Sequence, residues 1–436
     1  MHTLFTRALV AVGLMTAAAT SAHAIDIERV TSPGGIEAWL VSDNTVPVVA
    51  VDVAFKGAGA SQDPEGAAGR ASLMASLLEE GAGDLDSAAF QQALRDSAVR
   101  LGFSVSRDHL YGNMRALSAS VERGFDLLSL AIREPRFEEE AIERIRAKTV
   151  ASLRREEQDP DAVAARLWSA TAFPDHPYGA SRDGTVETVG ALTRDDLVAA
   201  RDAAVGRDNL VISVVGDIDA ERLGPLLDSA FGDLPQSADV TPVADVAPVT
   251  GETARATLQT PQTAIRFGMQ GLAREDPDFI PAVVMNHILG GGAFSSWLFE
   301  EVRDKRGLAY SVYSFIFPLD HSSIFGGGTA TANETAEEAL SVILAQIGRM
   351  AEEGPSEEEL TAAKAYLTGS YALRFNSSSS ISRQLLGIQV EDLGIEYVDV
   401  RNGLIDAVTL EDVRRVAGRI LGAGEPTVAI VGAPQG

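Results

Sequence analysis

Arg303 and Tyr310 are the residues of this chain whose types and spacing point to chemistry on a single substrate group. A guanidinium and a phenol are both hydrogen-bond donors, and these two stand seven residues apart. The local pattern predicts Arg303 in the last turn of a short helix and Tyr310 at the start of a strand, 308–317. This geometry could aim a cation and a phenol at one place. Residue types alone also fit a structural interpretation, in which the arginine complements the helix dipole and the tyrosine packs in a sheet.

The elements that would position this pair are indicated on both sides of it. The glycine run 290–292 ends one helical pattern, and we expect the side-chain oxygens of Ser295 and Ser296 to cap the N–H groups of the next helix. Apolar residues recur at helical spacing in that helix: Phe294, Trp297, Leu298 and Val302. The basic residues and glycine at 305–307 are typical of a helix C-terminus.

A family resemblance covers the same stretch. The run LFEEVRDKRGLAYSVYS, residues 298–314, and the preceding GGGAFSS closely resemble the second-half motif of the insulinase/pitrilysin (inverzincin) metallopeptidases. That family includes the mitochondrial processing peptidase subunits and their bacterial relatives. An arginine and a tyrosine seven residues apart bind the substrate backbone there and stabilise the transition state. The resemblance therefore implies these roles for Arg303 and Tyr310.

The chain contains an internal repeat. A glycine precedes Asp-Pro as GASQDP in the first half and as GLAREDP in the second, which sets Asp63 against Asp276, 213 residues apart. The strand patterns that end in SVVG and AIVG set Gly216 against Gly432, 216 residues apart. Two copies of one α+β unit are therefore predicted.

The repeat also predicts the domain organisation. Residues 236–252 are rich in Pro, Ala, Val, Asp and Thr without a helical period, and this composition is typical of a linker. It would join an N-terminal domain, 25–235, to a C-terminal domain, 253–436. The resemblance implies that each domain is α+β, with an antiparallel-rich sheet covered by helices, and that the two homologous domains face each other across a chamber.

The zinc motif of the family is missing. Active members carry His-x-x-Glu-His on the first helix, where the spacing puts two imidazoles one turn apart beside a general base. The matching helix here is GRASLMASLLEEG, and the three positions become Ser72, Ala75 and Ser76. Helical spacing predicts that these residues lie opposite the apolar stripe of the helix, which consists of Leu73, Met74, Leu77 and Leu78.

The third family ligand is a glutamate on a later helix, and the matching position is Ala151 or Ser152. No other site replaces the lost one. After residue 24 only four histidines remain, His109, His176, His287 and His321, and no two lie within five residues. There is no G-x-S-x-G elbow, and no lysine follows the glycines at 326–328, so neither a serine hydrolase nor a phosphate loop is indicated. We expect no metal in this chain.

Composition bears on the compartment. Residues 1–24 combine Arg7, an apolar run and an A-x-A site, which predicts a cleaved signal peptide and a periplasmic protein without a membrane span. No cysteine is present, so neither a disulfide nor a thiolate is available. The net charge of −26 disfavours nucleic acid as a partner.

Three functions remain. The pattern of a retained Arg/Tyr pair and a lost metal site fits the second subunit of a two-chain zinc peptidase, as the resemblance implies. A homologous partner would then hold the zinc, the two chains would form a heterodimer, and a peptide would be the substrate. A structural or peptide-binding protein without a catalytic partner is the alternative, but it has no need of Arg303 and Tyr310. A peptidase with unfamiliar ligands fits least well.

Overall fold

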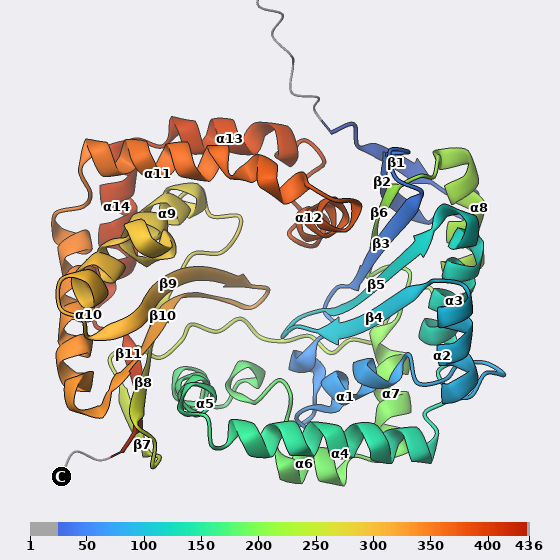
Figure 1. The fold of residues 1–436 in the computed structure, drawn as a ribbon, viewed down its shortest axis with the longest axis horizontal. Helices are drawn as coiled ribbons and strands as arrows, with labels where there is room; N and C mark the ends of the chain where they lie inside the picture. The colour runs from blue at the N-terminus through green and yellow to red at the C-terminus, as the bar shows by residue number, and fades with distance from the viewer. Residues whose placement is uncertain (1–24, 434–436) are drawn as a thin grey trace, which may run out of the picture.

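The computed structural model describes residues 25–433, so the predicted signal peptide lies outside the described residues. Two β-sheets stand at opposite ends of the molecule, with helices around and between them (Figure 1). The N-terminal sheet has the strand order β1-β2-β6-β3-β5-β4, and only β2 and β6 pair in parallel. Its strands are β1 (Glu28–Thr31), β2 (Glu37–Ser42), β3 (Val48–Phe55), β4 (Arg100–Val105), β5 (Leu110–Leu117) and β6 (Leu210–Gly216).

The C-terminal sheet repeats this arrangement. Its order is β7-β11-β8-β10-β9, and the parallel pair, β7 with β11, stands in the same place as β2 with β6. Its strands are β7 (Thr253–Thr257), β8 (Gln262–Gln270), β9 (Ala309–Leu319), β10 (Ser322–Ala332) and β11 (Thr427–Gly432). Gly216 and Gly432 end the two equivalent strands β6 and β11. The predicted α+β fold with two similar halves is confirmed.

Most helices of the first half cover the outer face of its sheet or run below it in the view of Figure 1. Their bounds are α1 (Arg70–Leu77), α2 (Ser87–Asp96), α3 (Val121–Arg133), α4 (Glu139–Glu156), α5 (Pro160–Ala172), α6 (Val186–Ala191), α7 (Arg194–Ala204) and α8 (Ala220–Phe231). Local sequence explains several of the starts. Asp86 and Asp219 accept backbone N–H groups at the beginnings of α2 and α8, and Pro160 occupies the first turn of α5, where its missing N–H costs nothing.

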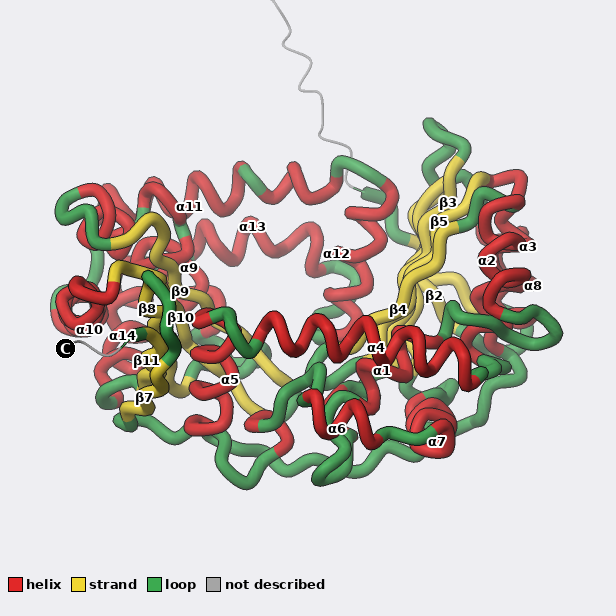
Figure 2. The backbone as a smooth tube through the Cα atoms, turned by 60° about the horizontal axis from the view of Figure 1, so that its bottom comes forward, coloured by secondary structure: helices red, strands yellow, loops and turns green. Residues whose placement is uncertain are grey.

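Helices of the second half follow the same plan. They are α9 (Phe279–Asn286), α10 (Ala336–Glu352), α11 (Glu357–Gly369), α12 (Ser378–Val390), α13 (Tyr397–Ala407) and α14 (Leu410–Ile420). Thr409 and Asp412 form a capping box on α14, as Thr193 and Asp196 do on α7. In Figure 2 the sheets are again at opposite ends, and α11 and α13 extend from the second half toward the first.

One helix of each half packs on the sheet of the other half. Helix α5 lies against β8 and β11, and α12 lies against β3 and β6 (Figure 1). Trp168 of α5 contacts the backbone of Gly268, where a Cβ would meet its ring at 2.4 Å, and its Nε1 donates to the Thr427 carbonyl at 3.0 Å. On the other side, the Ser213 hydroxyl donates to the Ser382 carbonyl at 2.7 Å. The two halves are therefore joined by exchanged helices.

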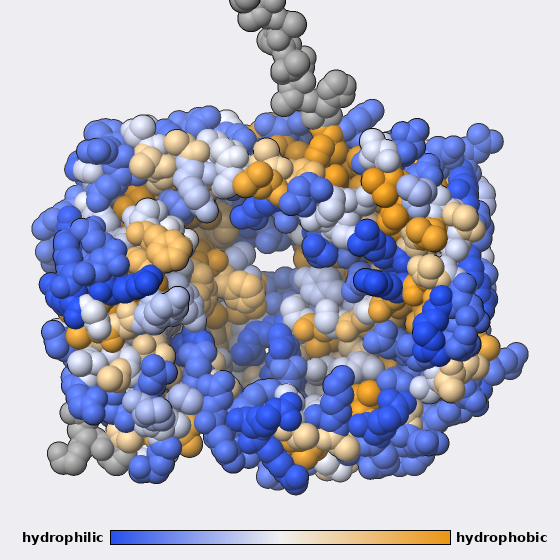
Figure 3. Space-filling view, in the orientation of Figure 1, coloured by the Kyte–Doolittle hydropathy of each residue, from blue (hydrophilic) through white to orange (hydrophobic). Residues whose placement is uncertain are grey.

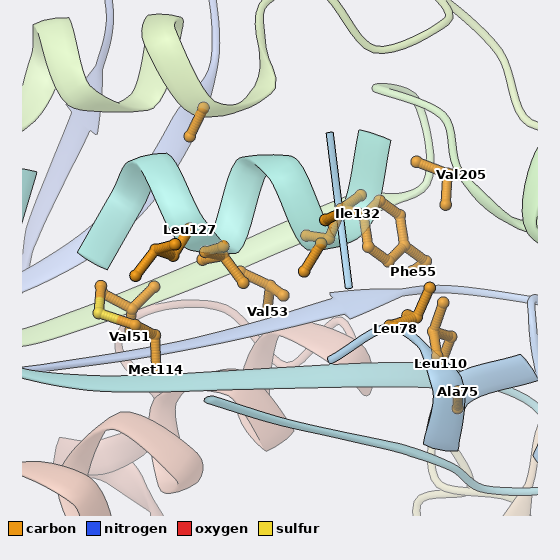
Figure 4. Close-up of a cluster of buried hydrophobic side chains, with 14 of the residues drawn as sticks. Val51, Val53, Phe55, Ala75, Leu78, Leu110, Met114, Leu127, Ile132 and Val205 are labelled. Atoms are coloured by element: carbon orange, nitrogen blue, oxygen red, sulfur yellow. The ribbon is translucent and has the colours of Figure 1, made fainter. Parts of the chain in front are cut away.

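Each half has its own large core. Apolar side chains from α1, α3, β3 and β5 meet beneath the first sheet, and Figure 4 shows Val51, Phe55, Met114 and Leu127 among them. Smaller clusters lie under the exchanged helices, where Trp39 and Val215 meet Leu385 and where Trp168 and Phe173 meet Ile324. Residues 235–252 contain neither helix nor strand.

Candidate functional site

Arg303 lies on a wide helical turn, Phe299–Asp304, and Tyr310 lies at the start of β9. Gly307, with φ of +62°, allows the chain to reverse between them. The Arg303 guanidinium carbon stands 4.8 Å from the centre of the Tyr310 ring, 4.6 Å from that of Phe299 and 5.7 Å from that of Phe294. The structure thus brings together the cation and the phenol that the sequence predicted to meet.

The Tyr310 side chain is 83% exposed, because a β-bulge redirects it. The pairing of β9 with β10 shifts between Thr329 and Thr331, so that one extra residue stands on β9. As a result both Tyr310 and Ser311 are exposed, while Val312 is buried. The Tyr310 hydroxyl is therefore directed into open space beside Arg303.

The loop before this turn differs from the prediction. The hydroxyls of Ser295 and Ser296 donate to the carbonyls of Gly292 and Ala293, at 3.0 and 2.8 Å, so they do not cap the next helix. Ala293 has φ of +47°, a left-handed conformation that is uncommon for alanine. The tight turn that results leaves Phe294 75% exposed, with its ring edge-on against Phe299 at 4.8 Å.

The residues at the family's metal positions do not fit zinc. Ser72 donates its hydroxyl to Asp183 Oδ1 at 2.8 Å, and Arg182 pairs with the same carboxylate at 2.7 Å. The Ser76 hydroxyl donates to the Ser72 carbonyl of its own helix at 3.0 Å. A hydroxyl, a carboxylate and a guanidinium thus occupy the place where a histidine ligand would meet zinc. No step of a reaction can therefore be assigned to a metal here.

Ala75 corrects the expectation about the face of this helix. Its side chain is only 1% exposed and belongs to the same buried cluster as Leu78 and Leu110 (Figure 4). Of the three positions, only Ser72 and Ser76 reach the surface side of α1. The prediction that all three positions lie opposite the apolar stripe was wrong for Ala75, because this helix is buried on most of its circumference.

The third ligand position also lacks a ligand. Both candidates lie on α4, where Ala151 is exposed and the Ser152 hydroxyl is 3.3 Å from Glu156 Oε1 on its own helix. Within residues 25–433, no three His, Asp or Glu side chains gather closely enough to hold a metal ion. Helix α1 and the start of β9 lie in different halves, on opposite sides of the central opening (Figure 1).

A polar junction at the centre of the molecule was missed by the sequence analysis. The Tyr178 hydroxyl is completely buried, donates to Asp108 Oδ1 at 2.6 Å and accepts the His321 N–H at 3.1 Å. His109 Nε2 lies 3.3 Å from Asp320 Oδ1. Burial raises the pKa of Tyr178 and the pKa of Asp108 above their usual values.

This junction joins the tips of two hairpins, β4–β5 and β9–β10, and each tip carries an Asp-His dipeptide. The repeated dipeptide, at 108–109 and at 320–321, is the sequence signal that could have revealed it. A cavity of about 900 Å³ opens beside the junction, lined from both halves by side chains that include Lys56, Asp392 and Phe317. Burial raises the pKa of Tyr111, which also lines the cavity, to about 12.

Two family models together match most of the chain. The insulinase (peptidase family M16) model matches residues 38–186, and the peptidase M16 inactive domain model matches residues 191–367. This chain belongs to the insulinase family. The family that the sequence motif resembles is therefore confirmed by matches on both sides of residue 190.

The similar proteins include one named as a zinc protease and one named as a non-peptidase homologue. An uncharacterised zinc protease of Streptomyces coelicolor is 26% identical over 420 residues, covering 93% of this chain and 89% of the relative. A non-peptidase homologue of Helicobacter pylori is 28% identical over 342 residues, which is 78% of each protein.

Solved structures of similar proteins show the same fold. A peptidase M16 inactive domain from Pseudomonas fluorescens has a TM-score of 0.88 at 25% identity, covering 94% of this chain and 98% of that one. A protease from Helicobacter pylori has a TM-score of 0.85 at 20% identity, which shows likeness of fold alone. Among the described residues, no helix has the length and apolar character needed to cross a bilayer.

Proposed function

We propose that this chain is the non-catalytic, substrate-binding subunit of a two-chain extracytoplasmic zinc peptidase. A homologous partner that keeps His-x-x-Glu-His would supply the metal and the general base. This chain would supply Arg303 and Tyr310, which donate hydrogen bonds to the scissile carbonyl or its neighbour as negative charge develops. The heterodimer thereby divides between two chains what a complete site requires.

One observation carries this proposal. Arg303 and Tyr310 are held together in an exposed place, and across residues 25–433 the guanidinium forms no ion pair. A structural arginine would normally meet a carboxylate or a carbonyl. At the same time the metal positions of α1 are occupied by a hydroxyl network and a buried methyl group. A retained donor pair without ligands fits a site completed by another chain.

The proposal is tested by mixing. Peptide hydrolysis should be absent for this chain alone, low for the zinc-bearing partner alone and high for the mixture. Arg303→Ala and Tyr310→Phe should each lower the activity of the mixture by about one to three orders of magnitude, with less than additive effects in the double variant, because the donors act on one charge. Association, measured by sedimentation, should be unchanged.

Matched controls exist in this chain. Arg349 stacks on Trp297 at 4.0 Å on α10, and Tyr366 is 62% exposed on α11, so Arg349→Ala and Tyr366→Phe remove the same groups elsewhere. Both control mixtures should keep full activity. Hydrolysis by this chain alone would contradict the division of labour. A mixture indifferent to both Arg303→Ala and Tyr310→Phe would favour the alternative, a peptide-binding protein with no catalytic partner.

The compartment is part of the proposal. The A-x-A site at residues 22–24 supports cleavage after Ala24 and a periplasmic mature protein. N-terminal sequencing of the chain from the periplasmic fraction should give a sequence that starts at Ile25. A product in the cytoplasm that retains Met1 would refute this part.

A further inference from the structure

The inner face of β9 carries three aromatic residues at alternate positions, Tyr313, Phe315 and Phe317, which we call the aromatic stripe. Their side chains are 37%, 38% and 48% exposed, whereas Ser314 between them is 4% exposed. Large apolar side chains that stay exposed in a row on one sheet face are unusual in the absence of a ligand or partner.

Glycines on the next strand form the floor of the stripe. In the pairing of β10 with β9, Gly328 stands opposite Tyr313 and Gly326 stands opposite Phe315. A Cβ added to Gly326 would lie 3.1 Å from Phe315 Cζ, so the missing side chain lets that ring lie over the backbone. The rings of Tyr313 and Phe315 are 6.3 Å apart and inclined by only 26°. The two rings form a continuous, partly exposed apolar surface on the sheet.

The stripe is fixed at one end by Arg266 of β8. The guanidinium donates to the Tyr313 hydroxyl and to Asp161 at the start of α5, and stands 5.6 Å from the centre of the Tyr313 ring. Helix α5 covers the same sheet face over β7, β8 and β11 and stops short of β9. The stripe is therefore the open part of an otherwise covered inner face.

The aromatic stripe lies between the Arg303–Tyr310 pair and the cavity. Tyr310, seven residues before Phe317, belongs to the proposed site, and Phe317 lines the 900 Å³ cavity. An extended strand rises about 3.3 Å per residue, so the path from Tyr310 to Phe317 is about 23 Å, the length of about seven extended residues. Apolar surface borders the central opening on the side of β9 and β10 (Figure 3).

We propose that the aromatic stripe selects peptides with apolar side chains at alternate positions, which lie extended along β9 between the Arg303–Tyr310 pair and the cavity. This rests on the proposed function for the nature of the substrate. The period of two in the rings matches the period of an extended peptide. Recognition uses the face of the sheet, because Asn286 Nδ2 donates to the Ser314 carbonyl at 3.4 Å and occupies the middle of the strand edge.

Peptide binding to the isolated mature chain tests this proposal without hydrolysis. Two fluorescent nonapeptides of equal charge are compared by anisotropy, one with Leu or Phe at alternate positions and one with Ser or Asn there. The parent chain should bind the apolar peptide about tenfold or more tightly, since two or three side chains leave water on binding. Phe315→Ala/Phe317→Ala should reduce this preference to less than about threefold.

Two controls keep the result clear. Leu404, on α13, is 45% exposed, close to the 48% of Phe317, so Leu404→Ala removes similar exposed surface elsewhere and should leave the preference intact. Phe317→Ala alone removes the most exposed ring and should give an intermediate preference, which covers the case in which the double variant does not fold. Equal binding of both peptides by the parent, or an undiminished preference in the folded variants, would overturn the proposal.

The same peptides separate this proposal from the proposed function. If the mixture with a zinc-bearing partner hydrolyses both peptides equally well while Arg303→Ala abolishes hydrolysis, the stripe proposal fails and the proposed function stands. If the isolated chain shows the preference but no mixture hydrolyses either peptide, the stripe proposal stands and the proposed function fails.

Discussion

Arg303 lies against three aromatic rings, and no carboxylate among residues 25–433 pairs with it. Each ring face attracts a guanidinium by about 0.5 to 2 kcal/mol, depending on how much water is excluded. This attraction fixes the carbon of the guanidinium and leaves its N–H groups available to a substrate. A carboxylate would hold the cation more strongly but would occupy the same N–H groups that the proposed chemistry needs.

Asp63 is a second residue whose environment has a measurable effect. Its carboxylate accepts the N–H groups of Gly69 and Ala71, both at 2.9 Å, and its side chain is 5% exposed. Burial raises its pKa to about 6, from 3.8 in the unfolded chain. Because the folded pKa is the higher one, Asp63 contributes stability that is complete below pH 3.8 and is lost as the pH rises through 6.

Asp63→Asn should therefore remove a pH dependence. Relative to the variant, the parent should lose up to about 3 kcal/mol of its free energy of unfolding between pH 4 and pH 7. Urea unfolding at several pH values measures this. Asp276→Asn is the control with the opposite sign, since hydrogen bonds from Arg419 lower the pKa of Asp276 and its contribution is present at neutral pH. Parallel stability curves for parent and Asp63→Asn would disprove the assignment.

For these two aspartates, the sequence predicted the equivalent positions but not the pKa shifts. The repeat predicted that Asp63 and Asp276 occupy equivalent places. In the structure, Asp63 lies between β3 and α1, and Asp276 lies between the equivalent elements β8 and α9. Their opposite pKa shifts could not be predicted, because burial around one and Arg419 beside the other come from residues distant in sequence. The same holds for the ring of Phe294 over Arg303, which depends on the conformation of Ala293.

At the scale of elements, the periodic patterns were the reliable signal. The predicted strand 308–317 is β9, Ala309–Leu319, and the strand pattern that ends at Gly216 is β6, Leu210–Gly216. The exchange of α5 and α12 was not predicted. An amphipathic period tells which face of a helix is buried, but it does not tell which sheet buries that face.

Trp168 gives a direct test of the exchange. Trp168→Ala should lower the free energy of unfolding by about 3 to 5 kcal/mol, because it leaves a cavity over Gly268 and removes the bond to Thr427. It should also split one cooperative transition into two, since this side chain joins the halves. Trp297, which is 4% exposed within the second half, is the control, and Trp297→Ala should lower the midpoint of the single transition without splitting it. Calorimetry distinguishes these outcomes, and a single unsplit transition for Trp168→Ala would count against the exchange.

At the scale of the whole molecule, the two similar halves meet at their hairpin tips. The Asp-His dipeptides at 108–109 and 320–321 face each other there, and three of the four histidines after residue 24 lie around Tyr178. The two dipeptides look unrelated in the sequence because 212 residues separate His109 from His321. These histidines are committed to joining the halves, not to binding a metal at the position of α1.

Metal content is a property of the entire chain and is predicted to be zero. Elemental analysis of the purified mature protein after dialysis should find far less than one zinc per chain, because Ser72, Ala75 and Ser76 offer neither imidazole nor carboxylate. A homologue that keeps His-x-x-Glu-His, treated in parallel, should retain about one zinc and so validates the dialysis. Stoichiometric zinc in this chain would refute the prediction.

The exchanged helices also determine the order in which contacts can form during synthesis. Strand β6 ends at Gly216, but α12, which covers it, begins at Ser378, so during synthesis the apolar surface around Trp39 and Val215 stays uncovered while more than a third of the protein is made. Helix α5 in turn cannot complete its packing until β11, the last strand, has been synthesised. Contacts of such long sequence separation form slowly. A ribosome that stalls before α12 would therefore release a first half with exposed apolar surface. That fragment would be prone to aggregation and would be a target for chaperones and proteases.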